Sequence, residues 1–398
     1  MIDTLKYALK LAVHWLTDVA QVKTEKLTIE RDSANHKHAC WKGAIRGEYS
    51  VANKTWDFFA PCWHTGQAIK ALVMASRVPG LEDREKVLDA AIEGANFLLV
   101  NQVWDEKDEN HGLILAYEDY GHLVNTSAIL ETCDGLLHLA DATGNQSFRD
   151  RVIGALDFVA RKLYLPGQGL FVDAYDPEKK STDNFYGTGG RPLLDDAMFL
   201  KGWKLTGRED FKRIFIETCD CLIDAEDPPG NWISFKPASI TGGYIHPRHA
   251  YWWGMPFIDA YESFNDPKYL AIAKRAAEWY ARAIRKDGGM MRDTFVDFNT
   301  PSFGHATSGT ACAVLLWLRL KEATGMEGYD KAIETCLNYC TSLQFRFPED
   351  ENLLGAILEK VLPPDGSDRN PYHIRDLGTI FFIQAVSAYL LAAEKKEK

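Results

Sequence analysis

The sequence predicts an all-α protein of the (α/α)6 barrel class, a toroid in which six helical hairpins close into a ring. The first observation behind this prediction is a phrase that recurs about every sixty residues: an apolar helical pattern ends at Gly, Asn or Pro, and a new pattern begins. The phrase is clearest at Gly144, Gly207, Asn265 and Gly325, with a weaker copy at Gly80. Because glycine and asparagine adopt the left-handed conformation that ends a helix, these stops have a physical cause.

The second observation is that each repeat holds two helical patterns of different character. One pattern has a charged face and apolar residues at helical spacing, which is typical of a half-exposed outer helix. These outer patterns cover residues 4–20, 83–102, 147–163, 210–225, 267–285 and 328–345. The other pattern is apolar nearly all round, which is typical of a buried inner helix. These inner patterns cover residues 62–78, 122–142, 191–206, 249–264, 305–324 and 375–394.

The pairing of patterns gives the expected architecture. Stacked hairpins bury one another's apolar faces, and six of them can close into a ring with the apolar helices inside. The starts of the inner helices then share one end of the ring and form a funnel. No Ser- or Pro-rich linker separates the repeats, so residues 1–398 are expected to form a single catalytic domain.

Composition sets the class of protein and its compartment. A hydrophobic content of 46% supports a large core, and no apolar run approaches the length of a membrane span. The first ten residues form an amphipathic pattern without the layout of a signal peptide, so we expect an unexported, cytoplasmic protein. The net charge of −11, without a basic stripe, argues against nucleic acid as a partner. A membrane partner is not expected either, and assembly into a homo-oligomer stays open.

The cysteines indicate neither disulfides nor a metal site. Eight cysteines, most of them inside helical patterns and none with zinc-ligand spacing, fit a reducing compartment. Cys336 and Cys340 share a helical face, but two buried thiols are the better interpretation. The sequence also lacks a Gly-rich phosphate loop and a nucleophile elbow. We therefore expect no metal and no cofactor.

Charged, histidine and aromatic side chains gather at the starts of the inner helices, and six of the eleven histidines are among them. Helix capping explains the Asp, Ser and Asn residues but not the Arg, His and Trp residues. Aromatic faces stack on sugar rings, polar side chains bind hydroxyl groups, and the fork of an arginine binds a carboxylate, so the set favours an acidic sugar. The candidate substrate-binding residues are Trp63, His64, His122, Asn125, Arg191, Asp196, His246, Arg248, His249, Trp252, His305, Ser308 and His373.

Two carboxylates of the funnel suit acid/base chemistry. Glycoside hydrolysis usually needs one protonated carboxyl and one ionised carboxylate, and Asp119 and Asp195 lie on neighbouring hairpins at the same level. Asp196 could raise the pKa of a neighbouring carboxyl by its like charge. Simpler interpretations remain open: the pair Asp195 and Asp196 could cap a helix, and Asp119 could be a solvated loop charge.

Other residues of the funnel have competing interpretations. His64 is as well explained by a buried structural histidine as by a substrate contact. Trp252 is expected to face the sugar while Trp253 lies in the core, because neighbouring positions of a helix point in different directions. Arg292 lies in a loop with Asp293 and Asp297, and these residues are expected to form a local ion pair.

Four motifs carry a resemblance to a known group of enzymes. They are residues 117–122 (TyrGluAspTyrGlyHis), 191–200 (ArgProLeuLeuAspAspAlaMetPheLeu), 248–254 (ArgHisAlaTyrTrpTrpGly) and 308–311 (SerGlyThrAla). From about residue 60 onward, in register with the repeats, the chain resembles the (α/α)6 uronic-acid glycosidases. This group includes the β-glucuronidases of glycoside hydrolase family 154 and the related unsaturated glucuronyl and rhamnogalacturonyl hydrolases of families 88 and 105.

The resemblance implies roles for individual residues. One catalytic Asp of the unsaturated-sugar enzymes precedes the second inner helix in an Asp-x-Gly element, which corresponds to Asp119. The other opens the third inner helix and corresponds to Asp195. Their arginine element before the fourth inner helix corresponds to Arg248 with Trp252. His122, His246 and the Trp252–Trp253 pair depart from a typical unsaturated glucuronyl hydrolase and favour the saturated branch.

The resulting hypothesis is an exo-acting glycoside hydrolase that releases terminal β-linked glucuronic acid from an oligosaccharide or glycoside, with two carboxylates and no cofactor. A hydrolase of 4,5-unsaturated uronides is the first alternative. A sugar epimerase of the N-acylglucosamine 2-epimerase type is an alternative from another class, since His246, His249, His305 and His373 could act as acid and base. A non-catalytic sugar-binding toroid is a third.

Overall fold

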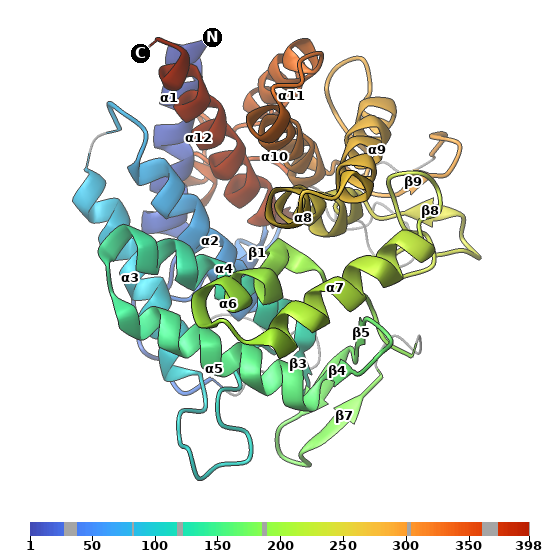
Figure 1. Ribbon diagram of the computed structural model, residues 1–398. Helices are drawn as coiled ribbons and strands as arrows, with labels where there is room; N and C mark the ends of the chain where they lie inside the picture. Colours follow the sequence, from blue (N-terminus) through green and yellow to red (C-terminus); the bar gives the residue numbers. More distant parts are fainter. Residues whose placement is uncertain are drawn as a thin grey trace.

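The protein forms a ring of paired helices, which confirms the predicted fold class (Figure 1). The computed structural model describes residues 1–27, 38–81, 83–117, 122–184, 189–300, 304–359 and 373–397. The outer helices of this described part are α1 (Ile2–His14), α3 (Arg84–Val100), α5 (Gln146–Lys162), α7 (Glu209–Asp224), α9 (Pro267–Ala283) and α11 (Asp330–Ser342). The inner helices are α2 (Pro61–Ser76), α4 (Thr126–Thr143), α6 (Met198–Thr206), α8 (Pro256–Phe264), α10 (Thr307–Thr324) and α12 (Leu377–Glu397).

The last inner helix closes the ring onto the first. Helix α12 packs against both α10 and α2, and α2 packs in turn against α4. The first helix, α1, packs on α12, so the two ends of the chain are neighbours in the ring (Figure 1). Helices α2 and α4 approach closely at two glycines: a Cβ atom on Gly135 would lie 2.0 Å from the carbonyl oxygen of Gly66. Any larger side chain at this crossing would force the two inner helices apart.

The predicted helix stops are confirmed by the backbone. Gly144, Gly207 and Gly325 follow α4, α6 and α10 with φ values of 71°, 71° and 70°, and Asn265 follows α8 with φ 53°. In each case the residue is left-handed and its N–H donates to a carbonyl oxygen in the last turn of the helix. These local signals therefore set the length of four inner helices.

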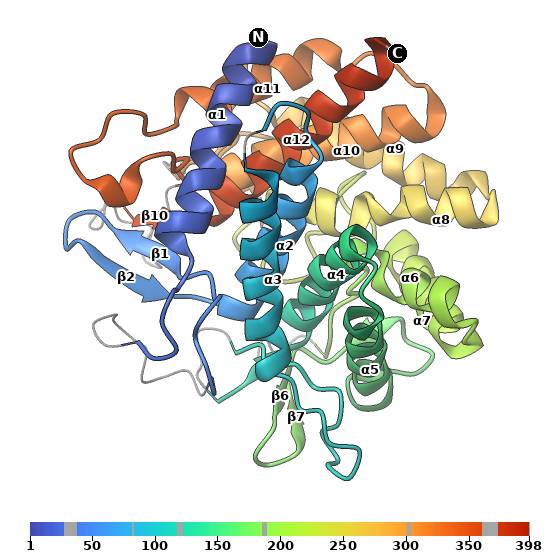
Figure 2. The same ribbon diagram turned by 90° about the vertical axis from the view of Figure 1, so that its left-hand side faces the viewer.

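Short strands, which the sequence analysis does not predict, lie beside the starts of the inner helices (Figure 2). Strand β1 (Gly47–Ser50) pairs antiparallel with β2 (Thr55–Phe58) and with β10 (His373–Arg375). Strand β6 (Ala174–Asp176) lies between β3 (Val124–Asn125) and β7 (Ser181–Asp183). The remaining pairs are β4 (Tyr164–Leu165) with β5 (Leu170–Phe171), and β8 (Tyr244–Ile245) with β9 (Thr294–Phe295).

Three inner helices begin at later residues than predicted, because strands or short irregular helices occupy the positions before them. Strand β3 occupies the positions before α4, and a 3-10 turn at Asp195–Ala197 precedes α6. A π-helical turn at Ala250–Gly254 precedes α8, where the sequence analysis expects the first turn of that helix. A similar turn at Trp15–Ala20 extends α1. The residues that the sequence places at helix starts therefore lie in the turns that lead into the inner helices.

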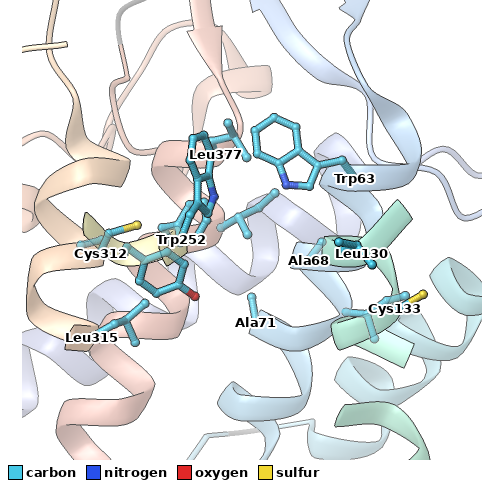
Figure 3. Close-up of a cluster of buried hydrophobic side chains, with 14 of the residues drawn as sticks. Trp63, Ala68, Ala71, Leu130, Cys133, Trp252, Cys312, Leu315 and Leu377 are labelled. Atoms are coloured by element: carbon cyan, nitrogen blue, oxygen red, sulfur yellow. The ribbon is translucent and has the colours of Figure 1, made fainter. Parts of the chain in front are cut away.

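The apolar character of α12 is explained by its place in the ring. Contrary to the expectation from the sequence, the stretch Leu377–Lys395 is long and apolar enough to cross a membrane by composition, with a mean hydropathy of 1.5. Of that window, 67% is buried inside the protein. Leu377 and the neighbouring inner-helix side chains Ala68 and Leu130 lie in one buried cluster (Figure 3). A buried core helix accounts for this composition.

Candidate active site

A pocket of about 240 Å³ opens where the inner helices begin. Its walls come from the turns before α2, α4, α6 and α8, from the loop before β9, and from β10. The lining residues are Phe59, Trp63, Asn125, Ser127, Glu131, Arg191, Pro237, His246, Arg248, Trp252, Arg292 and Arg375. The structure thus brings Trp63, Asn125, Arg191, His246, Arg248 and Trp252 together, as the sequence analysis expects of a funnel site.

Arg248 is held rigidly with one edge of its guanidinium unused. Its guanidinium carbon lies 5.0 Å from the ring centroid of Trp252 and 5.6 Å from that of Trp63. Its Nη1 donates to Ser308 Oγ at 2.8 Å and to Glu359 Oε1 at 3.5 Å. The Nε–H has no hydrogen-bond partner among the described residues, although only 3% of Arg248 is exposed. A buried donor of this kind is costly unless a ligand satisfies it, so the free edge is suited to an anion.

Ser308 and Glu359 support this arginine. Ser308 Oγ donates to Glu359 Oε1 at 2.8 Å, and the Ser308 backbone N–H donates to Glu359 Oε2 at 2.8 Å. Ser308 was predicted to bind substrate; the structure places it behind Arg248, as a bridge to a carboxylate. Glu359 was not among the predicted residues, because it lies in a stretch without a helical pattern.

Trp63, Trp252 and His246 give the pocket its aromatic surface. The rings of His246 and Trp252 are stacked, with centroids 5.0 Å apart and planes 7° from parallel. The His246 Nδ1 accepts a hydrogen bond from the Arg248 backbone N–H at 3.2 Å. Burial, with repulsion from Arg248, lowers the pKa of His246 well below its usual range. The imidazole is therefore neutral, with its proton on Nε2, where it can donate to a hydroxyl group.

Asp195, which is not among the residues that line the pocket, is a buried carboxyl that retains its proton at neutral pH. Only 1% of the residue is exposed, and its Oδ2 has no hydrogen-bond partner among the described residues. Burial raises the pKa of Asp195 to about 8; the nearby Arg191 opposes the shift and Asp196 adds to it. A carboxyl with a pKa close to the working pH is suited to general acid/base catalysis.

The backbone around Asp195 is strained in a way that separates it from Asp196. Asp196 and Ala197 both have positive φ, 49° and 53°. Two consecutive left-handed residues that are not glycine cost free energy and persist where the surrounding structure fixes them. Neither carboxylate forms a capping hydrogen bond to the helix that follows, so capping does not explain the pair. Asp196 instead accepts from Lys70 Nζ at 2.9 Å and borders a different cavity, of about 510 Å³.

Glu131 is a carboxyl of the pocket that the sequence analysis missed. It lies in the second turn of α4 and is 1% exposed; its Oε2 accepts from Trp63 Nε1 at 2.6 Å and from Gln67 Nε2 at 3.2 Å. Burial, and then the charges of Asp195 and Asp196, raises its pKa well above the usual range. Burial therefore favours the protonated form of Glu131, whose carboxyl interacts electrostatically with that of Asp195. The signal that could have found it is a charged residue inside an inner-helix pattern that is otherwise apolar.

Several predicted residues lie away from the pocket wall. His64 is 0% exposed and pairs with Asp376, with 2.5 Å between His64 Nδ1 and Asp376 Oδ1. His249 is 0% exposed and stacks on Trp253, which lies in the core as expected. His122 is exposed to solvent, and His305 Nδ1 is hydrogen-bonded to Tyr339 Oη at 2.7 Å. Asp119 and the side chain of His373 lie outside the described part, so their roles stay predictions.

Arginine is the main type of residue that the candidate set left out. Arg292 and Arg375 line the pocket with Arg191 and Arg248. Arg191 Nε donates to Asp173 Oδ1 at 2.7 Å, and Arg375 pairs with Glu48. The expected ion pair of Arg292 with Asp293 is not present: in the described residues, Arg292 forms no salt bridge. The pocket is therefore electropositive within a chain of net charge −11.

The described residues contain neither a cluster of metal ligands nor a cysteine whose pKa is lowered. No group of three or more His, Cys, Asp or Glu side chains in the described ranges has the arrangement needed to hold a metal ion. The cysteines are free thiols, and Cys133 and Cys312 lie in the buried cluster of inner-helix side chains (Figure 3). Burial raises the pKa of both thiols. A thiol with a raised pKa is a poor nucleophile.

Comparison with known proteins was made by sequence and by structure. Residues 197–354 match the family described as Glycosyl hydrolase family 76, which is less than half of the chain. No curated protein matches the sequence. An unsaturated glucuronyl hydrolase specific for heparin is similar in structure with a TM-score of 0.70 and 15% identity, covering 100% of this chain and 99% of that one.

Two further solved structures show the same similarity. The unsaturated glucuronyl hydrolase of Bacillus sp. GL1 has a TM-score of 0.67 and 14% identity, covering 100% of this chain and 97% of that one. The cellobiose 2-epimerase of Bacillus thermoamylovorans B4167 has a TM-score of 0.68 and 14% identity, covering 98% and 99%. Assignment to glycoside hydrolase family 154 stays a prediction. The chain therefore has a glycoside-hydrolase-like (α/α)6 barrel fold, which hydrolases and epimerases share.

Proposed function

We propose that this protein is an exo-acting glycoside hydrolase that releases terminal β-linked glucuronic acid. The observation that carries the proposal is the unused edge of Arg248, buried beside Trp63 and Trp252 in the pocket wall. The protonated Asp195 does not line the pocket but interacts electrostatically with two residues that do, Arg191 and Glu131. A guanidinium edge fits a carboxylate, and indole rings fit the apolar face of a sugar. The small pocket volume of about 240 Å³ suits one terminal sugar unit.

The roles of the two carboxyls follow from their environments. Asp195, whose pKa is about 8, is the general acid, and it transfers its proton to the glycosidic oxygen as the bond to the anomeric carbon breaks. A water molecule adds to the anomeric carbon, and a carboxylate accepts its proton. The sequence resemblance assigns the second carboxylate to Asp119. The sugar leaves as free glucuronic acid and the aglycone leaves as an alcohol.

A histidine-based epimerase has less support than a hydrolase. Of the three among these histidines whose side chains the structure describes, His246 alone is in the wall of the pocket; His249 is buried beside Trp253, and His305 is bonded to Tyr339. Burial lowers the pKa of His249 to about 3, so it is a poor base near neutral pH.

The direct test is to compare three reactions with the purified protein. Release of 4-nitrophenol from 4-nitrophenyl β-D-glucuronide should be clearly detectable, while the corresponding β-D-glucoside should react at least 10²-fold more slowly, on the order expected for loss of a charged contact. Interconversion of free glucose and mannose should be absent. Turnover of the glucoside and glucuronide at equal rates would contradict the proposal, and epimerisation of the free sugars would favour the alternative class.

Arg248→Lys should lower the affinity for glucuronides while neutral glucosides stay equally poor substrates. Lysine keeps the positive charge but loses the planar fork, and it cannot be held by Trp63 and Trp252 in the same way. The expected loss in kcat/KM for the glucuronide is on the order of 10²-fold. Steady-state kinetics on both substrates measure it. An unchanged preference for glucuronide over glucoside would remove Arg248 from the role of carboxylate binder.

Saturated glucuronides should react faster than 4,5-unsaturated ones, by roughly tenfold or more. The neutral His246, which offers an Nε2 proton to the pocket, is placed to bind a hydroxyl group such as the 4-hydroxyl. A buried polar site built for a hydroxyl discriminates against a sugar that lacks it. Loss of ultraviolet absorbance reports consumption of the unsaturated disaccharide. Faster consumption of that disaccharide would transfer the protein to the unsaturated branch.

A further inference from the structure

Arg292 has a defined place beside the pocket. It precedes β9, and its backbone N–H donates to the Gly304 carbonyl oxygen at 3.0 Å, while Met291 bridges to His305. The antiparallel pairing of β8 with β9 joins this segment to the turn that carries His246 and Arg248. The side chain of Arg292 is in the pocket wall with those of Arg248 and Arg375. With Arg191, four guanidinium groups therefore border a small space.

Arg292 differs from the other arginines of the pocket in its charge balance. Arg191 has Asp173, Arg375 has Glu48, and Arg248 has Glu359 as a carboxylate partner. In the described residues, the guanidinium of Arg292 forms neither an ion pair nor a hydrogen bond. Glu131, the remaining acidic side chain in the wall, has a pKa that burial raises well above its usual range, which favours its protonated form. Arg292 is thus the arginine of the pocket wall whose guanidinium has no carboxylate partner among the described residues.

This unpaired positive charge is unfavourable beside other positive charges. Burial lowers the pKa of Arg292 to about 10, and repulsion from Arg375 and Arg248 adds to the shift. Arg292 is partly buried, and a partly buried charge next to like charges has a cost that an anion in the pocket would lower. No aromatic ring lies under Arg292 in the described residues, so packing does not explain its position. An anion bound in the pocket would compensate this charge.

We propose that Arg292 is a specificity-determining residue that binds the same uronate carboxylate as Arg248, so that the pocket accepts a free uronic acid and rejects its methyl ester. The inference rests on the proposed function and names its substrate class. A free carboxylate brings one negative charge, which balances the unpaired positive charge of Arg292. An ester or a neutral sugar leaves Arg292 uncompensated, and it also offers only weak acceptors to two guanidinium groups.

The experiment compares the 4-nitrophenyl β-D-glucuronide with its methyl ester in the wild type, Arg292→Gln and Arg292→Lys. The wild type should prefer the free acid in kcat/KM on the order of 10²-fold, and Arg292→Gln should lose most of this preference because the free acid alone becomes slower. Arg292→Lys should be intermediate. The two changes, substitution and esterification, should be strongly non-additive in a double cycle. Additive effects would show that Arg292 does not act through the carboxylate and would overturn the inference.

Two controls separate this inference from the proposed function. Arg282→Gln changes an exposed arginine of α9 and should retain the wild-type preference for the free acid. Binding of D-glucuronate and D-glucose to Asp195→Asn, measured by calorimetry, is independent of turnover. Failure of Asp195→Asn to bind glucuronate more tightly than glucose would contradict the proposed function. Preferential binding of glucuronate that is unchanged by adding Arg292→Gln would overturn only the role of Arg292.

Discussion

Asp195→Asn should lower the turnover of a β-glucuronide on the order of 10²- to 10⁴-fold and leave the folded state intact. Asparagine has nearly the shape of aspartate but has no acidic proton to give to the leaving oxygen. The loss should be largest for an alkyl glucuronide, whose leaving group needs the proton. It should be much smaller for a dinitrophenyl glucuronide, whose leaving group departs as an anion. Steady-state kinetics on both substrates, with circular dichroism for the fold, measure these effects.

The pH profile provides an independent check on the same residue. Burial raises the pKa of Asp195 to about 8, so the carboxyl is protonated below that pH and ionised above it. A general acid works only in the protonated form, so kcat/KM should fall as the pH rises through about 8. This alkaline limb should be absent in Asp195→Asn. An activity that instead increases through the same range would show that Asp195 acts as the base.

Two further variants test whether the loss of turnover is specific to the two proposed catalytic carboxyls. Asp297→Asn alters an exposed aspartate outside the pocket and should retain full activity. Asp119→Asn should have a loss of the same order as Asp195→Asn, since the resemblance assigns the second carboxylate to Asp119. Near-wild-type turnover in Asp195→Asn would end the assignment of Asp195 as a catalytic residue.

The ring of hairpins could be predicted because its signals are local. A glycine such as Gly144 or Gly325 ends a helix through its own conformation, whatever packs around it. The small sheets could not be predicted in this way. Strand β1 meets β10 only when the ring closes, and Glu48 and Arg375 are 327 residues apart in the sequence. Such a pairing depends on the tertiary structure and has no local pattern.

In the candidate site too, some residues could be predicted from local sequence signals and others depend on tertiary packing. Arg248 and Trp252 could be identified because several unusual residues stand together at one helix start. Glu131 lies inside an apolar pattern, and its burial beside Trp63 results from the packing of α2 against α4. Arg292 has an acidic neighbour in the sequence, which suggests a local ion pair that the structure does not contain. Charged residues within apolar inner-helix patterns, such as Lys70 and Asp134, were the overlooked signal.

Lys70 joins inner helices on opposite sides of the barrel axis. From α2, its Nζ lies 2.8 Å from Asp134 Oδ2 on α4, 2.9 Å from Asp196 Oδ1, and 3.3 Å from Tyr251 Oη. Asp134 has a second cationic partner, Lys201 on α6, with 2.5 Å between Lys201 Nζ and Asp134 Oδ1. Asp196, by contrast, has Lys70 as its close cationic partner, with Gln67 Nε2 at 3.3 Å. This contact also fixes the strained turn next to Asp195.

Lys70→Met should destabilise the protein by about 3 to 5 kcal/mol, the usual cost of leaving one member of a buried ion pair alone. Methionine fills a similar volume but leaves the Asp196 carboxylate buried without a cation. The midpoint of unfolding in urea should therefore be lower, with an unchanged slope. Lys86→Met, which removes an exposed lysine paired with Asp18, is the matched control and should cost at most about 1 kcal/mol.

The loss in Lys70→Met should shrink as the pH is lowered, because Asp196 can then take up a proton. Burial already raises the pKa of Asp196 in the wild type, and removal of Lys70 takes away a charge that opposes this shift. A carboxyl whose pKa is higher in the folded than in the unfolded state binds more protons when folded, so falling pH favours the folded protein. Addition of Asp196→Asn to Lys70→Met should restore much of the stability at neutral pH. An equal loss at every pH, without recovery in the double variant, would mean that packing of the lysine stem rather than its charge holds this turn in place.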